Sequence, residues 1–168
     1  MVRKAATTDI SNTIQFVLEI DKLKGVLRKV RLIWEERYEN VAEHSWQIAL
    51  FAMSMARTLE LKVDVTHVVA MLLVHDLGEI DAGDRFVFAQ GGWEERRAAE
   101  LRALERICGL APRKTGGFLL GLWKEFDAAE SDEARFAKAI CQGHRSQHAR
   151  PFEPQQQRRK LAGERGEL

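Results

Sequence analysis

The sequence predicts an all-α fold, a single bundle of about five to seven helices. Apolar residues recur every three or four positions in several segments, which is the period of an amphipathic helix. No segment shows the alternation typical of half-buried strands, and no internal repeat is present. A chain of 168 residues is long enough for one domain with its own hydrophobic core.

The predicted helices follow one another from near residue 9 to residue 140. The first begins at a capping residue, Asp9 or Ser11, and loses its period at Gly25. A charged turn and a basic stretch separate it from the next helix. We interpret residues 86–88 as a loop that packs on the core, because three residues cannot form a sheet alone. The remaining helices are predicted over residues 40–59, 64–76, 93–108, 118–126 and 131–140.

Composition excludes several classes of protein. The chain has 26 basic and 25 acidic residues, so no overall field favours nucleic acid or a membrane. No apolar run approaches the roughly 20 residues of a membrane helix, and the N-terminus lacks the apolar core of a signal peptide. The two cysteines give no disulfide framework and are typical of free thiols in a reducing cytosol. We expect a cytoplasmic protein.

Residues 141–168 differ from the rest of the chain. They contain six basic and three acidic residues and show no apolar period. Such a segment cannot bury enough surface to offset the entropy of ordering it. We therefore divide the chain into a helical domain, residues 1–140, and a polar, basic tail, residues 141–168.

Three residues predict a metal site. His44 falls on the apolar stripe of the second helix, and the stripe of the third helix continues onto His75 and Asp76. A buried aspartate is costly unless a cation or a donor satisfies it. Two imidazoles and a carboxylate favour one divalent ion such as Mn, Co, Fe, Ni or Zn. The alternative for each histidine is a hydrogen-bonded core residue.

Further residues could complete a catalytic site. Glu79 lies one turn after His75, where a carboxylate can act as general base on a metal-bound water; its alternative is a solvated turn residue. Arg28 and Arg31 could receive a phosphate, or form a solvated helix end. Trp34 could stack on a base, or pack at the rim of the core. The sequence contains no Walker loop, no GxGxxG and no serine nucleophile elbow.

Together these residues resemble a known family. The set is similar to the HD-domain phosphohydrolases, in particular the small bacterial branch related to 5′-deoxynucleotidases, over about residues 9–140. One His-Asp pair is weak evidence, but four motifs in this order are specific. The matching motifs are Leu23–Arg28, Glu39–Trp46, Met71–Asp84 and Glu133–Ile140.

The resemblance implies an all-helical fold that holds one divalent metal through His44, His75, Asp76 and a fourth, distant aspartate. It also implies that Glu79 activates the attacking water and that Asp84 contacts the deoxyribose. An Arg and a Trp upstream of the first histidine help to hold the nucleotide in this family. A homodimer is expected as well.

The resemblance also implies substrate contacts upstream of His44. Downstream of His44, this sequence differs from the family's pattern at one position. Arg28 or Arg31, with Trp34, match the family's Arg and Trp. The fourth ligand should follow Ile140, and that position is Cys141. A thiolate binds Zn or Co well but is softer than a carboxylate.

Two further interpretations concern the segment around the fourth-ligand position. Lys138, near that position, could face the same pocket or be a surface lysine. We interpret the chain from about residue 141 onward as a frameshifted version of the family's C-terminus.

The predicted function is therefore metal-dependent hydrolysis of a small phosphate ester, a nucleotide such as a deoxynucleoside 5′-monophosphate. The alternative is a catalytically weakened HD-fold protein that binds a nucleotide or a partner without turnover, and both Cys141 and the polar tail motivate it. Binding of nucleic acid through the basic tail is a third, weaker hypothesis, and it predicts salt-dependent affinity blind to sequence.

Overall fold

The computed structural model describes residues 2–83 and 92–148. The substrate contact of Asp84, the loop at residues 86–88 and the part of the predicted tail from residue 149 onward lie outside these ranges. The predicted all-α class is confirmed, because helices α1 to α7 and the 3-10 helix η1 make up most of the described chain. The bounds are α1 Val2–Ile20, η1 Asp21–Gly25, β1 Leu27–Arg31, β2 Tyr38–Asn40, α2 Val41–Thr58, α3 Val65–Val74, α4 Glu79–Ala82, α5 Trp93–Leu110, α6 Arg113–Ala128 and α7 Asp132–His148.

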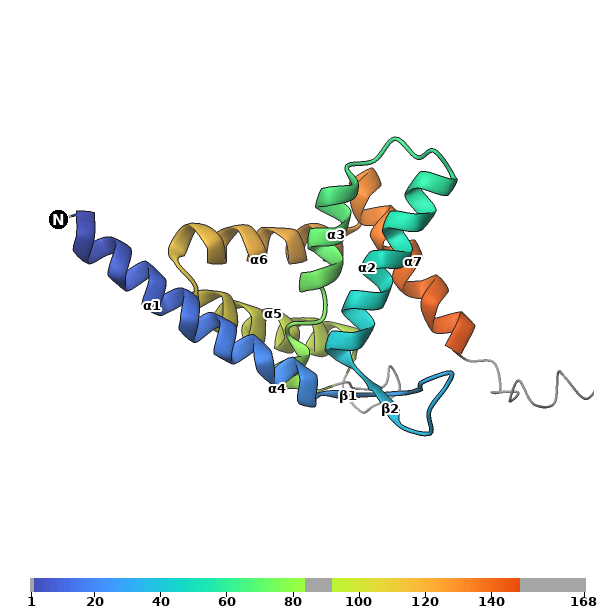
Figure 1. Cartoon of the computed structure of the whole chain (residues 1–168), viewed down its shortest axis with the longest axis horizontal. Helices are drawn as coiled ribbons and strands as arrows, with labels where there is room; N and C mark the ends of the chain where they lie inside the picture. Colours follow the sequence, from blue (N-terminus) through green and yellow to red (C-terminus); the bar gives the residue numbers. More distant parts are fainter. Residues whose placement is uncertain (1, 84–91, 149–168) are drawn as a thin grey trace, which may run out of the picture.

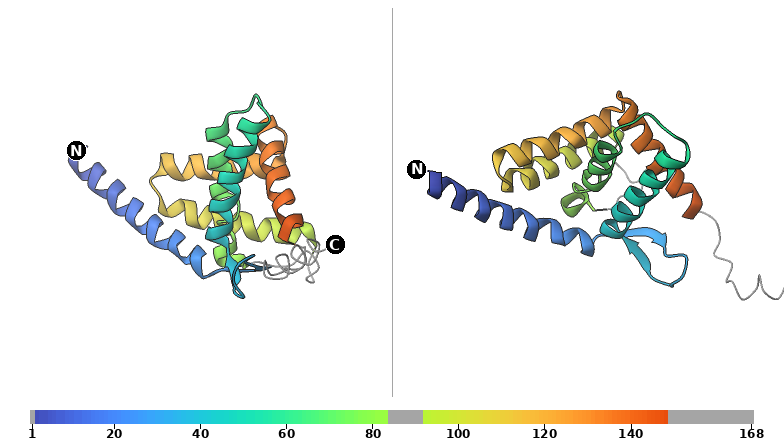
Figure 2. Two further views of the ribbon diagram at one scale, coloured as in Figure 1. Left: turned by 45° about the vertical axis from the view of Figure 1, so that its right-hand side comes forward. Right: turned by 45° about the horizontal axis from the view of Figure 1, so that its top comes forward.

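The helices form two packed groups (Figure 1). Helices α2, α3 and α7 lie side by side, while α5 packs on α6, and α6 in turn contacts α3 and α7. Helix α1 packs along α5, and its N-terminal end stands away from the other helices (Figure 2). Within the described ranges, none of the helices combines the length and apolar character needed to cross a membrane.

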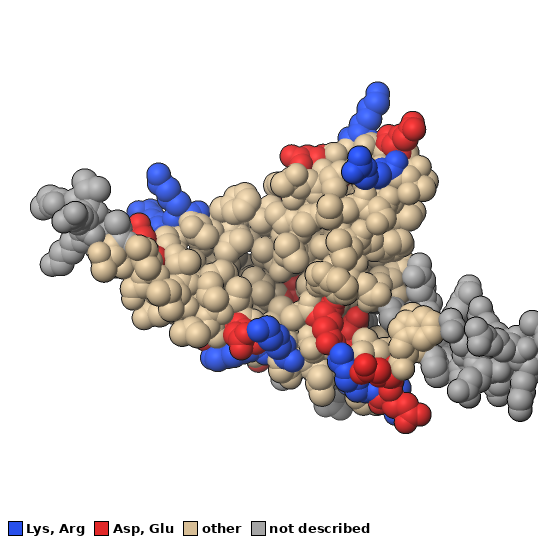
Figure 3. All heavy atoms as spheres, in the orientation of Figure 1, with Lys and Arg blue, Asp and Glu red and all other residues tan. Residues whose placement is uncertain are grey.

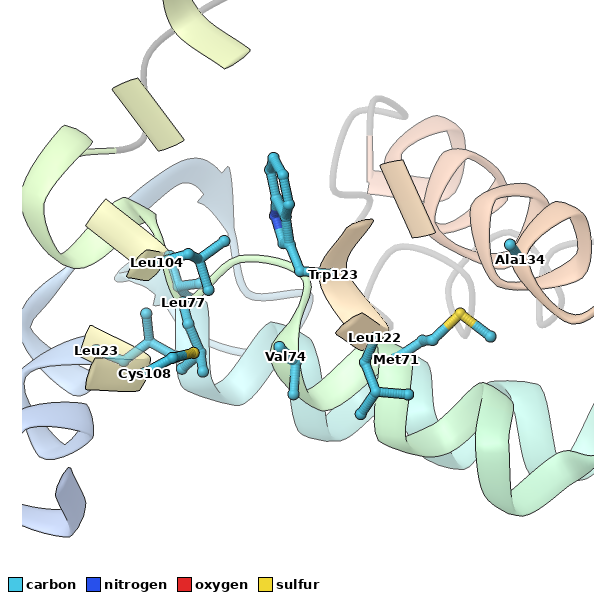
Figure 4. Close-up of a cluster of buried hydrophobic side chains, with 10 residues drawn as sticks. Leu23, Met71, Val74, Leu77, Leu104, Cys108, Leu122, Trp123 and Ala134 are labelled. Atoms are coloured by element: carbon cyan, nitrogen blue, oxygen red, sulfur yellow. The ribbon is translucent and has the colours of Figure 1, made fainter. Parts of the chain in front are cut away.

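Two clusters of buried side chains hold these groups together. One cluster joins η1, α2, α3, α5, α6 and α7 and includes the labelled residues of Figure 4. In it the Trp123 indole donates a hydrogen bond to the carbonyl oxygen of His75, at 3.1 Å. The other cluster joins α2, α3 and α7 around Ile48, Leu72 and Ile140. The end of α3 is therefore fixed from two sides, and His75 lies at that end.

Side-chain caps set the helix starts that matter for the site. Asn40 and Glu43 form a capping box at α2: the Asn40 side chain accepts from Glu43 N at 2.9 Å, and Glu43 accepts from Asn40 N at 3.1 Å. Asp64 caps α3 through His67 N, and Ser131 caps α7 through Ala134 N. The starts predicted for these three helices are confirmed.

The prediction that the chain contains no strand is wrong between η1 and α2. Strands β1 and β2 form an antiparallel hairpin that pairs Leu27 with Asn40 and Arg31 with Tyr38. From the sequence, this stretch is expected to be a basic segment followed by a charged turn. The strands have only five and three residues and four charged side chains, so their alternation is too short to recognise.

The predicted end of the last helix at Ile140 is also wrong. Helix α7 continues to His148, so residues 141–148 of the predicted tail are helical. Cys141 and His144 are buried because they follow Ala137 at four and seven residues, on the face that packs against α2 and α3. Residues 149–168 lie outside the described ranges, and the frameshift interpretation stays a hypothesis.

The first helix begins earlier than predicted, at Val2 rather than at Asp9 or Ser11. Residues 2–8 contain no glycine or proline, and Arg, Lys and Ala favour a helix there. Its apolar side chains are largely exposed: the exposed residues are Ile10, Ile14, Val17 and Leu18. Figure 3 shows acidic and basic side chains close together in the lower part of the view, near the C-terminal end of α1 and the hairpin.

A close contact between α5 and α6 gives a first testable prediction. A β-carbon at Gly116 would overlap the carbonyl oxygen of Cys108, which belongs to the helix backbone and cannot turn aside. We expect Gly116→Ala to lower the free energy of unfolding by about 1–3 kcal/mol. At Gly117 a β-carbon meets nothing within 4 Å, so Gly117→Ala should raise stability by about 0.5–1 kcal/mol. Urea denaturation of the two variants tests this, and equal stabilities would contradict the contact.

Candidate metal centre

The structure brings four predicted metal-site residues together. His44 ends the first turn of α2, His75 and Asp76 directly follow α3, and Cys141 belongs to α7. His44, His75 and Cys141 are buried. One ring nitrogen of each histidine and the Cys141 sulfur all lie within 4.8 Å of one another. Packing of α2 and α7 on α3 thus creates the cluster from distant parts of the chain.

The carboxylate of Asp76 lies between the two imidazoles. Its Oδ2 is 2.9 Å from His75 Nε2 and 3.8 Å from His44 Nε2. The sulfur of Cys141 lies 3.8 Å from the same His75 nitrogen. Two imidazoles, a carboxylate and a thiol are donors that fit Zn or Co, and a smaller set without the thiol also fits Mn or Fe.

The ring orientations fit a bound metal ion. His75 Nδ1 donates to the carbonyl oxygen of Leu72 at 2.8 Å, which turns Nε2 toward Asp76. Both ring nitrogens of His44 are buried and have no hydrogen-bond partner among the described residues. A buried polar atom without a partner costs free energy, and a cation at His44 Nε2 would remove that cost.

The protonation states agree with this arrangement. Burial and the nearby Arg28 lower the pKa of His44 to about 2, so its imidazole is neutral and ready to act as a ligand. Burial opposes the charge of His75, but Asp76 and Cys141 raise its pKa well above the ordinary value. Although burial acts in the opposite direction, His75, His44 and Arg28 together lower the pKa of Asp76. Without metal, His75 and Asp76 therefore form an ion pair, and an incoming ion displaces a proton.

A buried ion pair of the hairpin lies beside these ligands. Arg28 Nε is 3.1 Å from Glu39 Oε2, and Arg28 Nη1 is 3.4 Å from Asp76 Oδ2. The same Glu39 oxygen is 3.8 Å from Nδ1 of His44. Burial raises the pKa of Glu39, while Arg28 acts against this. Glu39 thus faces one edge of the His44 ring and Asp76 faces the other.

Glu79 is held on a short, closely packed turn. It is the first residue of α4 and is buried, with a carboxylate oxygen 3.9 Å from Arg96 Nη2. A β-carbon on the preceding Gly78 would lie 2.9 Å from the backbone oxygen of Glu100, so this turn packs directly on α5. A buried carboxylate three residues after Asp76 can take a proton from a water molecule at the site.

The predicted substrate residues are not all at the cluster. Arg28 is buried beside Asp76. Arg31 lies over the ring of Tyr38, on the exposed side of the hairpin, and Trp34 is 70% exposed. Lys138 donates to the carbonyl oxygen of Asp127 at 2.8 Å, so its ammonium group is engaged at the end of α6. Asp84 lies outside the described residues.

Two residues at the cluster were not predicted. Glu39 was part of a recognised motif but had no role, because its contact with Arg28 is formed across the hairpin. His144 lies with its ring 4.9 Å from that of His44, and its Nε2 is 3.0 Å from Gln47 Oε1. The spacing from Ala137 through Ile140 to His144 is helical and could have revealed it.

The chain is similar to known proteins. The family model of the HD domain matches residues 20–143. A 5′-deoxynucleotidase HDDC2 from Xenopus laevis is 29% identical over 143 residues, which cover 82% of this chain and 70% of the relative. The mouse protein of the same name is 30% identical over 75% of this chain and 64% of its own length.

A solved structure is similar as well. The crystal structure of a predicted metal-dependent phosphohydrolase from Magnetospirillum magnetotacticum has a TM-score of 0.72 and 40% identity to this chain. The match covers 80% of this chain and 67% of that protein. The family match spans the hairpin, the four clustered residues and α7 as far as residue 143.

Proposed function

The chain belongs to the HD-domain family of metal-dependent phosphohydrolases, and from this premise we propose that it hydrolyses a phosphomonoester, specifically a deoxynucleoside 5′-monophosphate. One observation carries the proposal: His44, His75 and Asp76 converge, with a buried histidine whose two ring nitrogens have no hydrogen bond among the described residues. The sugar and phosphate position are proposed because the curated relatives are named 5′-deoxynucleotidases.

In this proposal His44, His75 and Asp76 hold one divalent ion, with Cys141 as the fourth ligand. A bound ion of this kind polarises a phosphate oxygen and lowers the pKa of a water molecule. Glu79, which is buried on the turn after the ligands, would accept the proton of such a water molecule. Arg28 has five N–H donors, of which Glu39 and Asp76 face two, so others can contact the phosphate.

The native metal is proposed to be Zn or Co. The donor at the family's fourth position is a sulfur atom, 3.8 Å from His75 Nε2. Thiolates prefer such ions to Mn or Mg, which favour oxygen. The presence of Cys141 in place of the family's aspartate also favours a second candidate function. In it the chain binds a nucleotide or a partner and hydrolyses the nucleotide slowly or not at all.

The experiment that tests the proposal measures phosphate release from a panel of ribo- and deoxynucleoside 3′- and 5′-monophosphates, with Zn, Co, Mn or no added metal. We expect release to require metal, to be blocked by a chelator and to be fastest with deoxynucleoside 5′-monophosphates. Metal-dependent release at equal rates from ribo- and deoxynucleotides would reject the proposed substrate specificity but would still support phosphomonoester hydrolysis. No metal-dependent release, with nucleotide binding retained, would favour the second candidate.

A homodimer is part of the proposal. The exposed apolar side chains of α1, Ile10, Ile14, Val17 and Leu18, offer a surface that a second copy could cover. Analytical ultracentrifugation of the purified chain tests this, and a monomer at high concentration would reject it. The cytoplasmic location stays a prediction.

A further inference from the structure

A second group of potential ligands lies on the other side of His44. Glu39, His44 and His144 are all buried, and each offers one atom within 4.8 Å of the atoms from the other two. Glu39 comes from β2, His44 from α2 and His144 from α7. Neither Glu39 nor His144 is needed for the centre of His44, His75, Asp76 and Cys141.

Two of these side chains present a donor atom. Glu39 Oε1 is buried and has no hydrogen-bond partner among the described residues, while its other oxygen lies 3.1 Å from Arg28 Nε. The Gln47 amide oxygen, 3.0 Å from His144 Nε2, accepts a hydrogen bond from that nitrogen. A neutral imidazole that donates from Nε2 keeps its lone pair on Nδ1. This is the way in which outer contacts orient a metal-binding histidine.

We propose that Glu39, His44 and His144 form an accessory position for a divalent ion of the Zn, Co or Ni class. Two imidazole nitrogens and one carboxylate oxygen are a donor set that such ions accept. The first position is the centre of His44, His75, Asp76 and Cys141. The proposal concerns metal binding, and it rests on the proposed function only in assigning hydrolysis to the first position.

The two positions exclude each other. A neutral imidazole has one lone pair, so His44 serves one ion at a time, through Nε2 beside Asp76 or through Nδ1 beside Glu39. The accessory position is the weaker of the two, because it offers three ligands rather than four and because Arg28 lies closer to Glu39, at 3.1 Å, than to Asp76, at 3.4 Å. The chain therefore binds one ion of this class in total, at one position or the other. When the first position is disabled by mutation, the ion moves to the accessory position and stays bound to the chain.

The test uses a chain whose first position is disabled by two near-isosteric changes, Asp76→Asn and Cys141→Ser. Co²⁺ is titrated into this double variant, and binding is followed by calorimetry and by the visible absorption of the bound ion. We expect one Co²⁺ per chain. Adding His144→Ala should weaken binding by at least the roughly 10–100-fold that loss of an outer-shell partner of a metal site costs.

The matched control is His67→Ala in the same double variant, since His67 pairs with Glu125 at 2.8 Å and does not belong to either group. It should leave Co²⁺ affinity unchanged. Circular dichroism confirms that each variant is folded. Absence of Co²⁺ binding in the folded double variant, or binding that His144→Ala does not weaken, would overturn the accessory position.

If the double variant does not fold, the test can be made with a single substitution at the first position. In Asp76→Asn alone, an ion at the first position gives a thiolate-to-cobalt absorption band from Cys141, and an ion at the accessory position does not. His144→Ala should raise this band per bound Co²⁺, and an unchanged band would reject the proposal. These readouts are independent of hydrolysis: a wild-type chain without phosphatase activity rejects the proposed function and leaves the accessory position standing.

Discussion

Replacing Asp76 with asparagine is expected to abolish metal-dependent phosphate release. Asp76 Oδ2 is the oxygen that lies between the two histidine ligands, at 2.9 and 3.8 Å from their nitrogens. An amide is uncharged and a poorer ligand, so the ion leaves the first position. A metal ion supplies several kcal/mol of transition-state stabilisation, and about 1.4 kcal/mol is tenfold in rate. The rate should therefore fall by about 100-fold or more.

The control is Asp132→Asn, which removes an exposed aspartate of α7 that pairs with Arg135. It should leave the rate unchanged. The measurement is phosphate release at saturating substrate, at a series of concentrations of Zn or Co. A variant Asp76→Asn that works at the wild-type rate would show that the cluster is not the hydrolytic centre.

Replacing Glu79 with glutamine should give an equally large loss for a different reason. The glutamine keeps the size of the side chain on the packed turn but cannot accept a proton. General base catalysis contributes about 10²–10⁴-fold, so the rate should fall within this range. The metal content of the purified protein should stay at the wild-type value, because Glu79 is not among the grouped ligands. Metal analysis and phosphate release on the same samples separate the two effects.

Glu100→Gln is the matched control for Glu79→Gln. Both glutamates lie near Arg96, which contacts Glu100 at 2.7 Å and Glu79 at 3.9 Å. If loss of an Arg96 partner were the cause, both variants would be slow. A slow Glu79→Gln variant that has also lost its metal would instead identify Glu79 as a ligand.

The sequence predicts where His44 and the His75-Asp76 pair lie along their helices. The sequence predicts His44 on the inward face of α2 because apolar residues recur at helical spacing from Val41 to Leu59. The predicted third helix ended at Asp76, and α3 with the following turn agrees closely with this. Period and capping are local properties, and one sequence is enough to recognise them.

The parts that sequence reasoning missed depend on contacts between distant residues. Arg28 and Glu39 meet only because the chain reverses between them, and strands of five and three residues give no clear period. The sequence does not predict the end of α7, because the polar composition after Ile140 is typical of a segment that packs on nothing. Burial of Cys141 and His144 against α2 and α3 extends the helix despite that composition.

The ion pair between Arg28 and Glu39 has a consequence for how this sequence can evolve. Removing one member of a buried pair leaves an uncompensated charge and costs about 3–5 kcal/mol, whereas replacing both by apolar residues can be neutral. Either substitution alone therefore destabilises the protein, so this pair can be replaced in evolution only when both codons change at almost the same time. Because the pair also borders Asp76 and His44, any replacement must in addition keep the electrostatic potential at these two proposed metal ligands. We expect positions 28 and 39 to covary among descendants of this gene, and a library randomised at both positions would measure that coupling.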